Sequence, residues 1–116
     1  MKLWPFHTRE DDTMTITVVP RNYENLYGLL IKKEQQLRPK GAFYRAPGRL
    51  KGYTKWHHVK HGGWVWLRQA MSGVAVVEIE SKNPDEVWKI LSAFVGFLDR
   101  YFKDKISSVS INYSKS

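Results

Sequence analysis

The chain has 116 residues and a formal net charge of +8, which suits one domain with one modest core. It has no cysteine, so disulfides, thiolate nucleophiles and cysteine-ligated metals are excluded. No apolar run approaches the roughly 18 residues of a membrane span, and residues 1–7 lack the apolar region of a signal peptide. We therefore expect a soluble, cytoplasmic protein.

The first predicted element is a strand. Residues 1–12 show no periodic pattern and are assigned as a leader. Residues 13–19 alternate between threonines and apolar side chains, which is typical of a half-buried strand, and Pro20 ends it. We assign residues 13–113 to one α+β domain and residues 114–116 to a C-terminal tail.

The next pattern is helical. Asn22 is the predicted N-cap of a helix that runs to about Leu37. Leucines and tyrosines recur at helical spacing, and we expect Tyr23 on this core-facing stripe. Glu34 is expected on the solvent-facing side.

Residues 38–52 form a predicted loop, because two prolines and three glycines interrupt any regular period. From Arg38 to Arg68 the chain carries eight lysines and arginines and no acidic residue. Since a solvated surface normally mixes both signs of charge, this segment indicates an anionic partner.

Three strands are predicted after the loop. Residues 53–61 have an extended pattern, Gly62-Gly63 supplies a two-residue hairpin turn, and residues 64–70 return as the partner strand. A tight connection leads into a third strand over residues 74–80. The three strands are expected to form a meander.

The clearest local signal begins a second helix. Asn83 is a predicted N-cap, Pro84 suits the first turn, and the two acids that follow are favoured at the positive end of the helix dipole. An apolar stripe continues to Phe102, and residues 106–113 finish the domain as a strand.

This order of elements predicts the fold. Two helices joined to strands by right-handed crossovers can cover one face of a mainly antiparallel sheet. We expect a ferredoxin-like α+β sandwich variant, β-α-β-β-β-α-β, with an added strand. Its helix-covered face should carry Met14, Ile16, Val65, Leu67, Ala75, Val77, Ile79, Val109 and Ile111.

The open face of that sheet and the basic loop form the candidate site. Exposed tryptophans among cations are typical of a platform on which the bases of single strands stack, and the loop cations would neutralise phosphates. The predicted partner is therefore single-stranded DNA or RNA, bound with low sequence specificity. The predicted binding residues are Arg38, Lys40, Phe43, Tyr44, Arg45, Arg49, Lys51, Lys55, Trp56, His58, Lys60, Trp64, Trp66 and Arg68.

No metal or cofactor is expected. In a strand His57 and His61 would lie about 13 Å apart, too far to share one ion. The glycines of the loop match no phosphate-binding fingerprint. Trp64 and Trp66 also fit a different structural role, either in a small core under the loop or in a dimer interface.

Two alternative functions remain. A basic, aromatic surface could also dock on an acidic protein or on a second copy of the chain, as in an assembly or inhibitor module, because interface hot spots share this composition. A small metal-independent ribonuclease is the other alternative, with a histidine or tyrosine as general base and an arginine that stabilises the transition state. The residues available for this chemistry are Tyr53, His58, Lys60 and Arg68.

Overall fold

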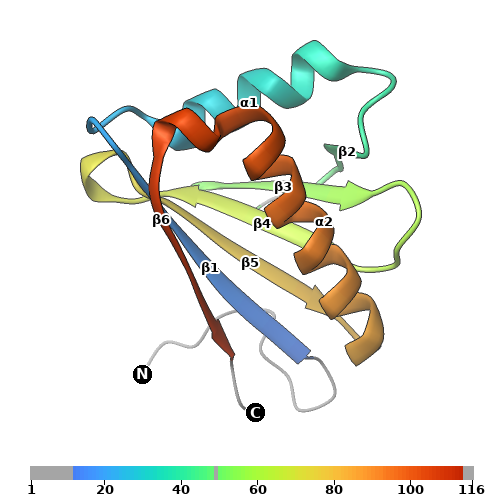
Figure 1. Cartoon of the computed structure of the whole chain (residues 1–116). Helices are drawn as coiled ribbons and strands as arrows, with labels where there is room; N and C mark the ends of the chain where they lie inside the picture. The colour runs from blue at the N-terminus through green and yellow to red at the C-terminus, as the bar shows by residue number, and fades with distance from the viewer. Residues whose placement is uncertain (1–11, 49, 114–116) are drawn as a thin grey trace.

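The computed structural model describes residues 12–48 and 50–113, which form a sheet with two helices (Figure 1). The predicted leader, apart from its last residue, and the predicted C-terminal tail lie outside the described residues. The strands are β1 (Asp12–Pro20), β2 (Phe43–Arg45), β3 (Tyr53–His58), β4 (Trp64–Gln69), β5 (Ala75–Ser81) and β6 (Ile106–Tyr113). The helices are α1 (Leu26–Leu37) and α2 (Pro84–Phe102).

The six strands form one sheet in the order β2-β3-β4-β5-β1-β6, and every neighbouring pair is antiparallel. The predicted α+β class, the antiparallel sheet and the two helices are therefore confirmed. The strand order differs from that of a four-stranded ferredoxin-like sandwich, because β2 and β3 extend the sheet beyond β4. β2 was not predicted.

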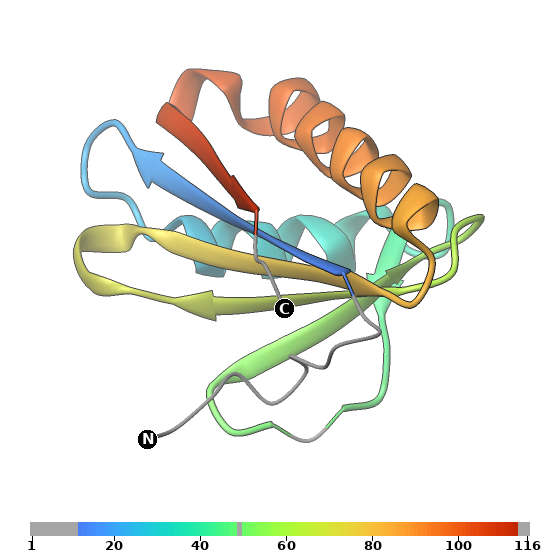
Figure 2. The same ribbon diagram turned by 90° about the horizontal axis from the view of Figure 1, so that it is seen from below.

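Both helices pack on one face of the sheet (Figures 1 and 2). Alternate residues of the strands point into this layer, as the pleat requires. The prediction for this face is confirmed at six fully buried positions: Ile16, Val65, Leu67, Ala75, Val77 and Ile79. Val109 and Ile111 lie on the same face, opposite Val18 and Ile16, but they remain exposed because β6 is the outermost strand.

Helix α1 begins later than predicted. Its N-cap is Asn25, whose side-chain Oδ1 accepts a hydrogen bond from the Gly28 N–H at 3.1 Å. Asn22 and Tyr23 precede the helix, and Tyr23 is exposed with a positive φ instead of lying on the core-facing stripe. Glu34, expected in solvent, is buried.

Helix α2 begins where the sequence predicts it. Asn83 Oδ1 accepts from the Asp85 N–H at 3.0 Å, and Pro84 is the first helical residue. The apolar stripe of α2 packs on the sheet through Val87, Ile90, Leu91, Phe94, Phe97, Leu98 and Phe102.

The connection between β3 and β4 is longer than predicted. β3 ends at His58, so residues 59–63 form the turn in place of Gly62-Gly63 alone. Gly63 has φ +143°, and a Cβ there would lie 2.7 Å from the Glu80 carbonyl oxygen, so the turn approaches β5 closely. Only glycine fits this conformation without strain.

Within residues 12–48 and 50–113, neither helix is long and apolar enough to cross a membrane.

Candidate nucleic-acid interface

The predicted basic loop contains the short strand β2, which gives this segment a defined orientation. β2 pairs with β3, so that Phe43 lies opposite His58 and Tyr44 opposite His57. Phe43 and His58 are buried on the helix side, whereas Tyr44 is exposed on the open face. Prolines and glycines on both sides of β2 conceal this strand in the sequence.

Glu34 holds the two arginines of this region in place. Its side chain is only 2% exposed, and its two oxygens accept hydrogen bonds from Nε and Nη2 of Arg38, each at 2.6 Å. Glu34 Oε2 also accepts from the backbone N–H of Arg45 at 3.3 Å. The hydrogen bonds from Arg38 hold the pKa of Glu34 below its ordinary value. Arg38 is therefore neutralised in part, and α1 is joined to β2.

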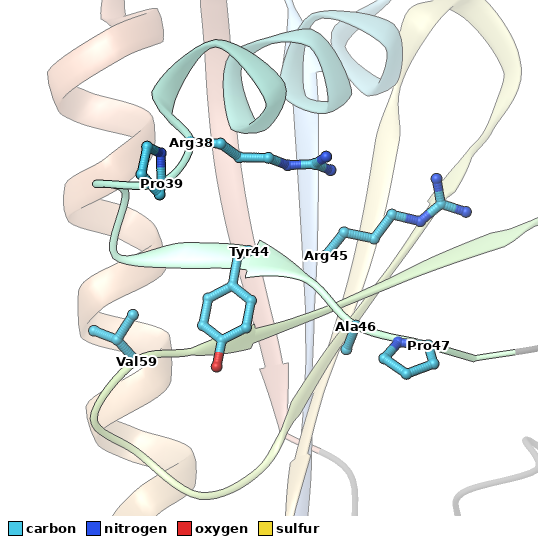
Figure 3. A pocket seen from close by; sticks show the side chains of 7 residues that line it. All are labelled: Arg38, Pro39, Tyr44, Arg45, Ala46, Pro47 and Val59. Carbon is cyan, nitrogen blue, oxygen red and sulfur yellow. The ribbon is translucent and has the colours of Figure 1, made fainter.

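A pocket of about 600 Å³ lies between the end of α1, β2 and the turn after β3 (Figure 3). In Figure 3 the Tyr44 ring lies between Val59 and Ala46 on one side of β2, and the side chains of Arg38 and Arg45 extend on the other side of the strand. Apolar walls with two guanidinium groups at the rim suit a planar ring that carries an anionic group.

Aromatic rings continue from Tyr44 across the open face of β3 and β4. The Tyr44 and His57 ring centroids are 4.0 Å apart, and those of His57 and Trp64 are 5.4 Å apart. Lys55 Nζ lies 3.8 Å from the Trp64 ring centroid, an attractive cation–π arrangement. Trp64 remains 37% exposed. These rings form a row with a cation beside its last member.

The other two tryptophans of the predicted site are buried. Trp66 faces the open side but is only 7% exposed, because the chain between β2 and β3 passes beneath the sheet at Gly48 (Figure 2). Its Nε1–H donates to Glu80 Oε1 at 3.1 Å. Trp56 faces the helices and packs on Phe94 and Phe97. The alternative prediction, a small core under the loop, is thus confirmed for Trp66.

Acidic side chains limit the basic surface. Glu78 and Glu80 on β5 face the same side as Trp66 and Trp64, which lie directly opposite them in the ladder. Glu78 Oε2 accepts from the Thr15 hydroxyl at 2.8 Å. The centre of the open face therefore carries two hydrogen-bonded carboxylates next to the cations of β3 and β4.

The histidines do not form the arrangement expected of a nuclease. Tyr53 and Arg68 lie opposite each other on the open face, whereas His58 faces the helices. His58 Nδ1 accepts from the Lys60 N–H at 3.0 Å. Burial lowers the pKa of His58, and the charges of His61 and Lys60 lower it further. Among the described residues, no cluster of three His, Cys, Asp or Glu side chains could hold a metal ion.

The structure brings together one part of the predicted site and disperses the rest. Lys40 lines a different hollow, on the helix side, with Arg100 and Tyr101. Lys51 and Lys60 are exposed in turns, and Arg49 lies outside the described residues. The residues that gather, here called the β2–β4 corner, are Arg38, Tyr44, Arg45, Lys55, His57 and Trp64.

Sequence reasoning missed His57, Glu34 and the apolar walls of the pocket. The alternation of β3 carried the signal for His57, because Lys55 and His57 must share one face and Trp56 and His58 the other. Each of these two faces of β3 carries an aromatic ring and a polar group, so residue composition alone does not show which face is buried. Glu34 gave no sequence signal of burial beyond its spacing of four residues from Arg38.

No protein-family model matches this chain, and a search of curated proteins found no match.

Proposed function

We propose that the β2–β4 corner binds single-stranded nucleic acid. The observation that carries this proposal is the row Tyr44–His57–Trp64, with Lys55 at one end and the arginine-rimmed pocket at the other. Stacking surfaces that alternate with cations match a strand of bases joined by phosphates.

In this proposal the bases stack and the cations contact phosphates. Exposed rings at Tyr44 and Trp64 offer faces to two bases, Lys55 lies beside the Trp64 ring where it can contact a phosphate, and Arg45 lines the same pocket as Tyr44. Because Arg38 is held by Glu34, it contributes mainly shape and hydrogen-bond donors to the pocket. Stacking and charge discriminate little between bases, so low sequence specificity follows.

The acids of the open face define the path of the strand. Glu78 and Glu80 place two carboxylates on the open face of β5, so we expect the strand to run over β2, β3 and the start of β4 instead of crossing the whole sheet. Duplex is disfavoured because its bases are paired and stacked internally, out of reach of the row. Asp85 and Glu86 in the first turn of α2 would likewise repel a duplex backbone at that helix end.

The test compares Trp64→Ala with Trp88→Ala. Trp88 is 54% exposed on α2, away from the corner, so it controls for the loss of a surface tryptophan. Fluorescence anisotropy with labelled single-stranded RNA, single-stranded DNA and duplex at about 50 mM salt should show single-strand binding by the unmodified protein. Trp64→Ala should weaken it by about 1–3 kcal/mol. Trp88→Ala should bind as the unmodified protein does.

Two results would contradict the proposal. One is no binding of any oligonucleotide at about 50 mM salt, where even non-specific cationic proteins hold nucleic acid. The other is equal affinity of Trp64→Ala and the unmodified protein when both have the same circular dichroism spectrum. Either result would favour an acidic protein segment as the partner, since the apolar walls of the pocket also suit a peptide side chain.

We also infer a ferredoxin-like unit within the larger sheet. The crossover from β5 through α2 to β6 straddles β1, and the chain from β1 through α1 to β4 straddles β5. Two crossovers that each enclose one antiparallel strand are the pattern of the split β-α-β fold. β2 and β3, which carry most of the corner, are then an addition to that unit.

A further inference from the structure

Strand β6 is an open edge of the sheet. It pairs with β1 on one side, and no strand of the described residues lies on its other side (Figure 1). All of its residues after Ile106 are exposed. The outer backbone groups of a strand eight residues long are therefore available for pairing.

Apart from a register shift at its start, where Ser108 pairs with Val19 and Ile106 with Pro20, this edge lacks the features that normally prevent pairing between proteins. Edge strands are usually short, charged, interrupted by proline or bulged. β2, at the opposite edge, has three residues, includes Arg45 and is followed closely by Pro47. β6 contains no charged residue and no proline, although the protein carries a net charge of +8.

Apolar side chains extend this edge on the helix side. Val109 and Tyr113 are exposed there, and Ile111 between them is 39% exposed. A groove beside them is lined by Val95 on α2. Apolar side chains therefore follow the outer side of β6.

We propose that β6 pairs with β6 of a second copy of this chain, about a two-fold axis perpendicular to the sheet that passes through Ser110. Such an axis keeps the helices of both copies on the same side of the joined sheet. Odd-numbered residues of β6 must then lie opposite odd-numbered residues of the other copy, and even-numbered residues opposite even-numbered ones. In this register Ser110 faces its own copy, Val109 faces Ile111 and Ser108 faces Asn112. Apolar pairs then lie on the helix side and hydrogen-bonding pairs on the open side.

The self-complementary register of β6 favours a second copy as the occupant, and the charge of this edge permits it. Two molecules with +8 each repel one another, and the repulsion is least when they meet through an uncharged edge. The β2–β4 corner is at the other end of the sheet, so pairing at β6 places the two corners as far apart as the strands allow. A stable dimer buries about 800 Å² per partner, and the groove lined by Val95 adds area to the strand edge.

The first test is the mass of the full chain by light scattering after size-exclusion chromatography, from micromolar to submillimolar concentration. We expect a dimer for the unmodified protein. Ile111→Lys should raise the dissociation constant at least about tenfold, because lysine on an edge strand opposes pairing. Met71→Lys adds the same charge at an exposed site near the β4–β5 turn and should leave the dimer intact. A monomer at every concentration would overturn the proposal.

The second test uses the absence of cysteine from the chain. Residues opposite each other in an antiparallel pair have Cα atoms about 4.5–5.5 Å apart, within the range of a disulfide. Ser110→Cys should therefore form a covalent dimer on mild oxidation. Ser72→Cys, exposed in the β4–β5 turn, should not. A dimer that Ile111→Lys does not weaken and that Ser110→Cys does not cross-link would show that another surface pairs.

Discussion

Glu34 is a buried carboxylate that organises the β2–β4 corner. It joins the Arg38 guanidinium at the end of α1 to the backbone of Arg45 in β2, and these two arginines form the rim of the pocket. A carboxylate out of water is tolerated only when its oxygens receive hydrogen bonds. The hydrogen bonds therefore fix the position of the Arg38 guanidinium and of the Arg45 backbone, and they lower the free charge that Arg38 offers.

Replacing this carboxylate should cost stability. Glu34→Gln keeps the shape of the side chain but loses charge-assisted hydrogen bonds, and we expect a loss of about 1.5–3 kcal/mol in the free energy of unfolding measured with urea. Glu24→Gln is the matched control, because Glu24 pairs with Lys105 at 3.3 Å on the surface. Its effect should stay below about 1 kcal/mol. Equal losses in the two variants would contradict the buried role of Glu34.

The same pair gives a pH dependence with a definite sign. Because folding lowers the pKa of Glu34, its contribution is complete above the ordinary glutamate pKa and is lost as the pH falls toward the lowered value. Between about pH 7 and about pH 3.5 the unmodified protein should therefore lose more stability than Glu34→Gln. Urea unfolding at the two pH values measures this difference.

At the scale of elements, the turn between β3 and β4 positions Trp64, the last ring of the aromatic row. It brings Gly63 against the backbone of β5 immediately before Trp64 begins β4. The neighbouring Gly62 has no atom within 4 Å of the position a Cβ would take. The two adjacent glycines therefore differ in whether they can accept a side chain: Gly62 can and Gly63 cannot.

This contrast predicts different effects for the same substitution. Gly63→Ala forces a Cβ against the Glu80 carbonyl oxygen and the Ile90 side chain, and should destabilise the protein by about 1–3 kcal/mol. Gly62→Ala should stay within about 0.5 kcal/mol of the unmodified protein. Thermal unfolding followed by circular dichroism compares the two. A tolerant Gly63→Ala would mean that the turn can move away from β5.

Most elements could be predicted from the sequence because their signals are local. The alternation of β1 and the cap of α2 each depend on a few adjacent residues, and both predictions are confirmed. β2 could not be predicted, since three residues between prolines and glycines become a strand only by pairing with β3. The burial of Trp56 and Trp66 likewise depends on distant segments, α2 for the first and the chain near Gly48 for the second.

At the scale of the whole molecule, the excess positive charge is divided between surfaces. Lys55 and Arg45 belong to the β2–β4 corner, whereas Lys40 and Arg100 line a hollow on the helix side. The sequence showed one run of cations, but the chain turns back between α1 and β2 and separates them. Only the cations of the corner should release counterions when a single strand binds there.

The salt dependence of binding measures this division. A plot of log affinity against log salt has a negative slope. Its magnitude should decrease by about 0.7 for Arg45→Ala and for Lys55→Ala, the amount expected for the loss of one phosphate contact with a single strand. Lys40→Ala should leave the slope unchanged. An equal reduction by all three substitutions in the same salt series would indicate a diffuse electrostatic attraction and no defined site.

The position of β1 has a consequence for how the protein is made. Ile16 lies between Val77 on β5 and Ile111 on β6, so the first strand finds its neighbours about sixty and about a hundred residues later in the chain. Contacts of such long range are slow to form because the intervening chain must first be closed into a loop. During synthesis the apolar side of β1 therefore has no partner strand until most of the polypeptide has left the ribosome. Among the described strands β6 is synthesised last and pairs only with β1, so it is the last of them that can join the sheet.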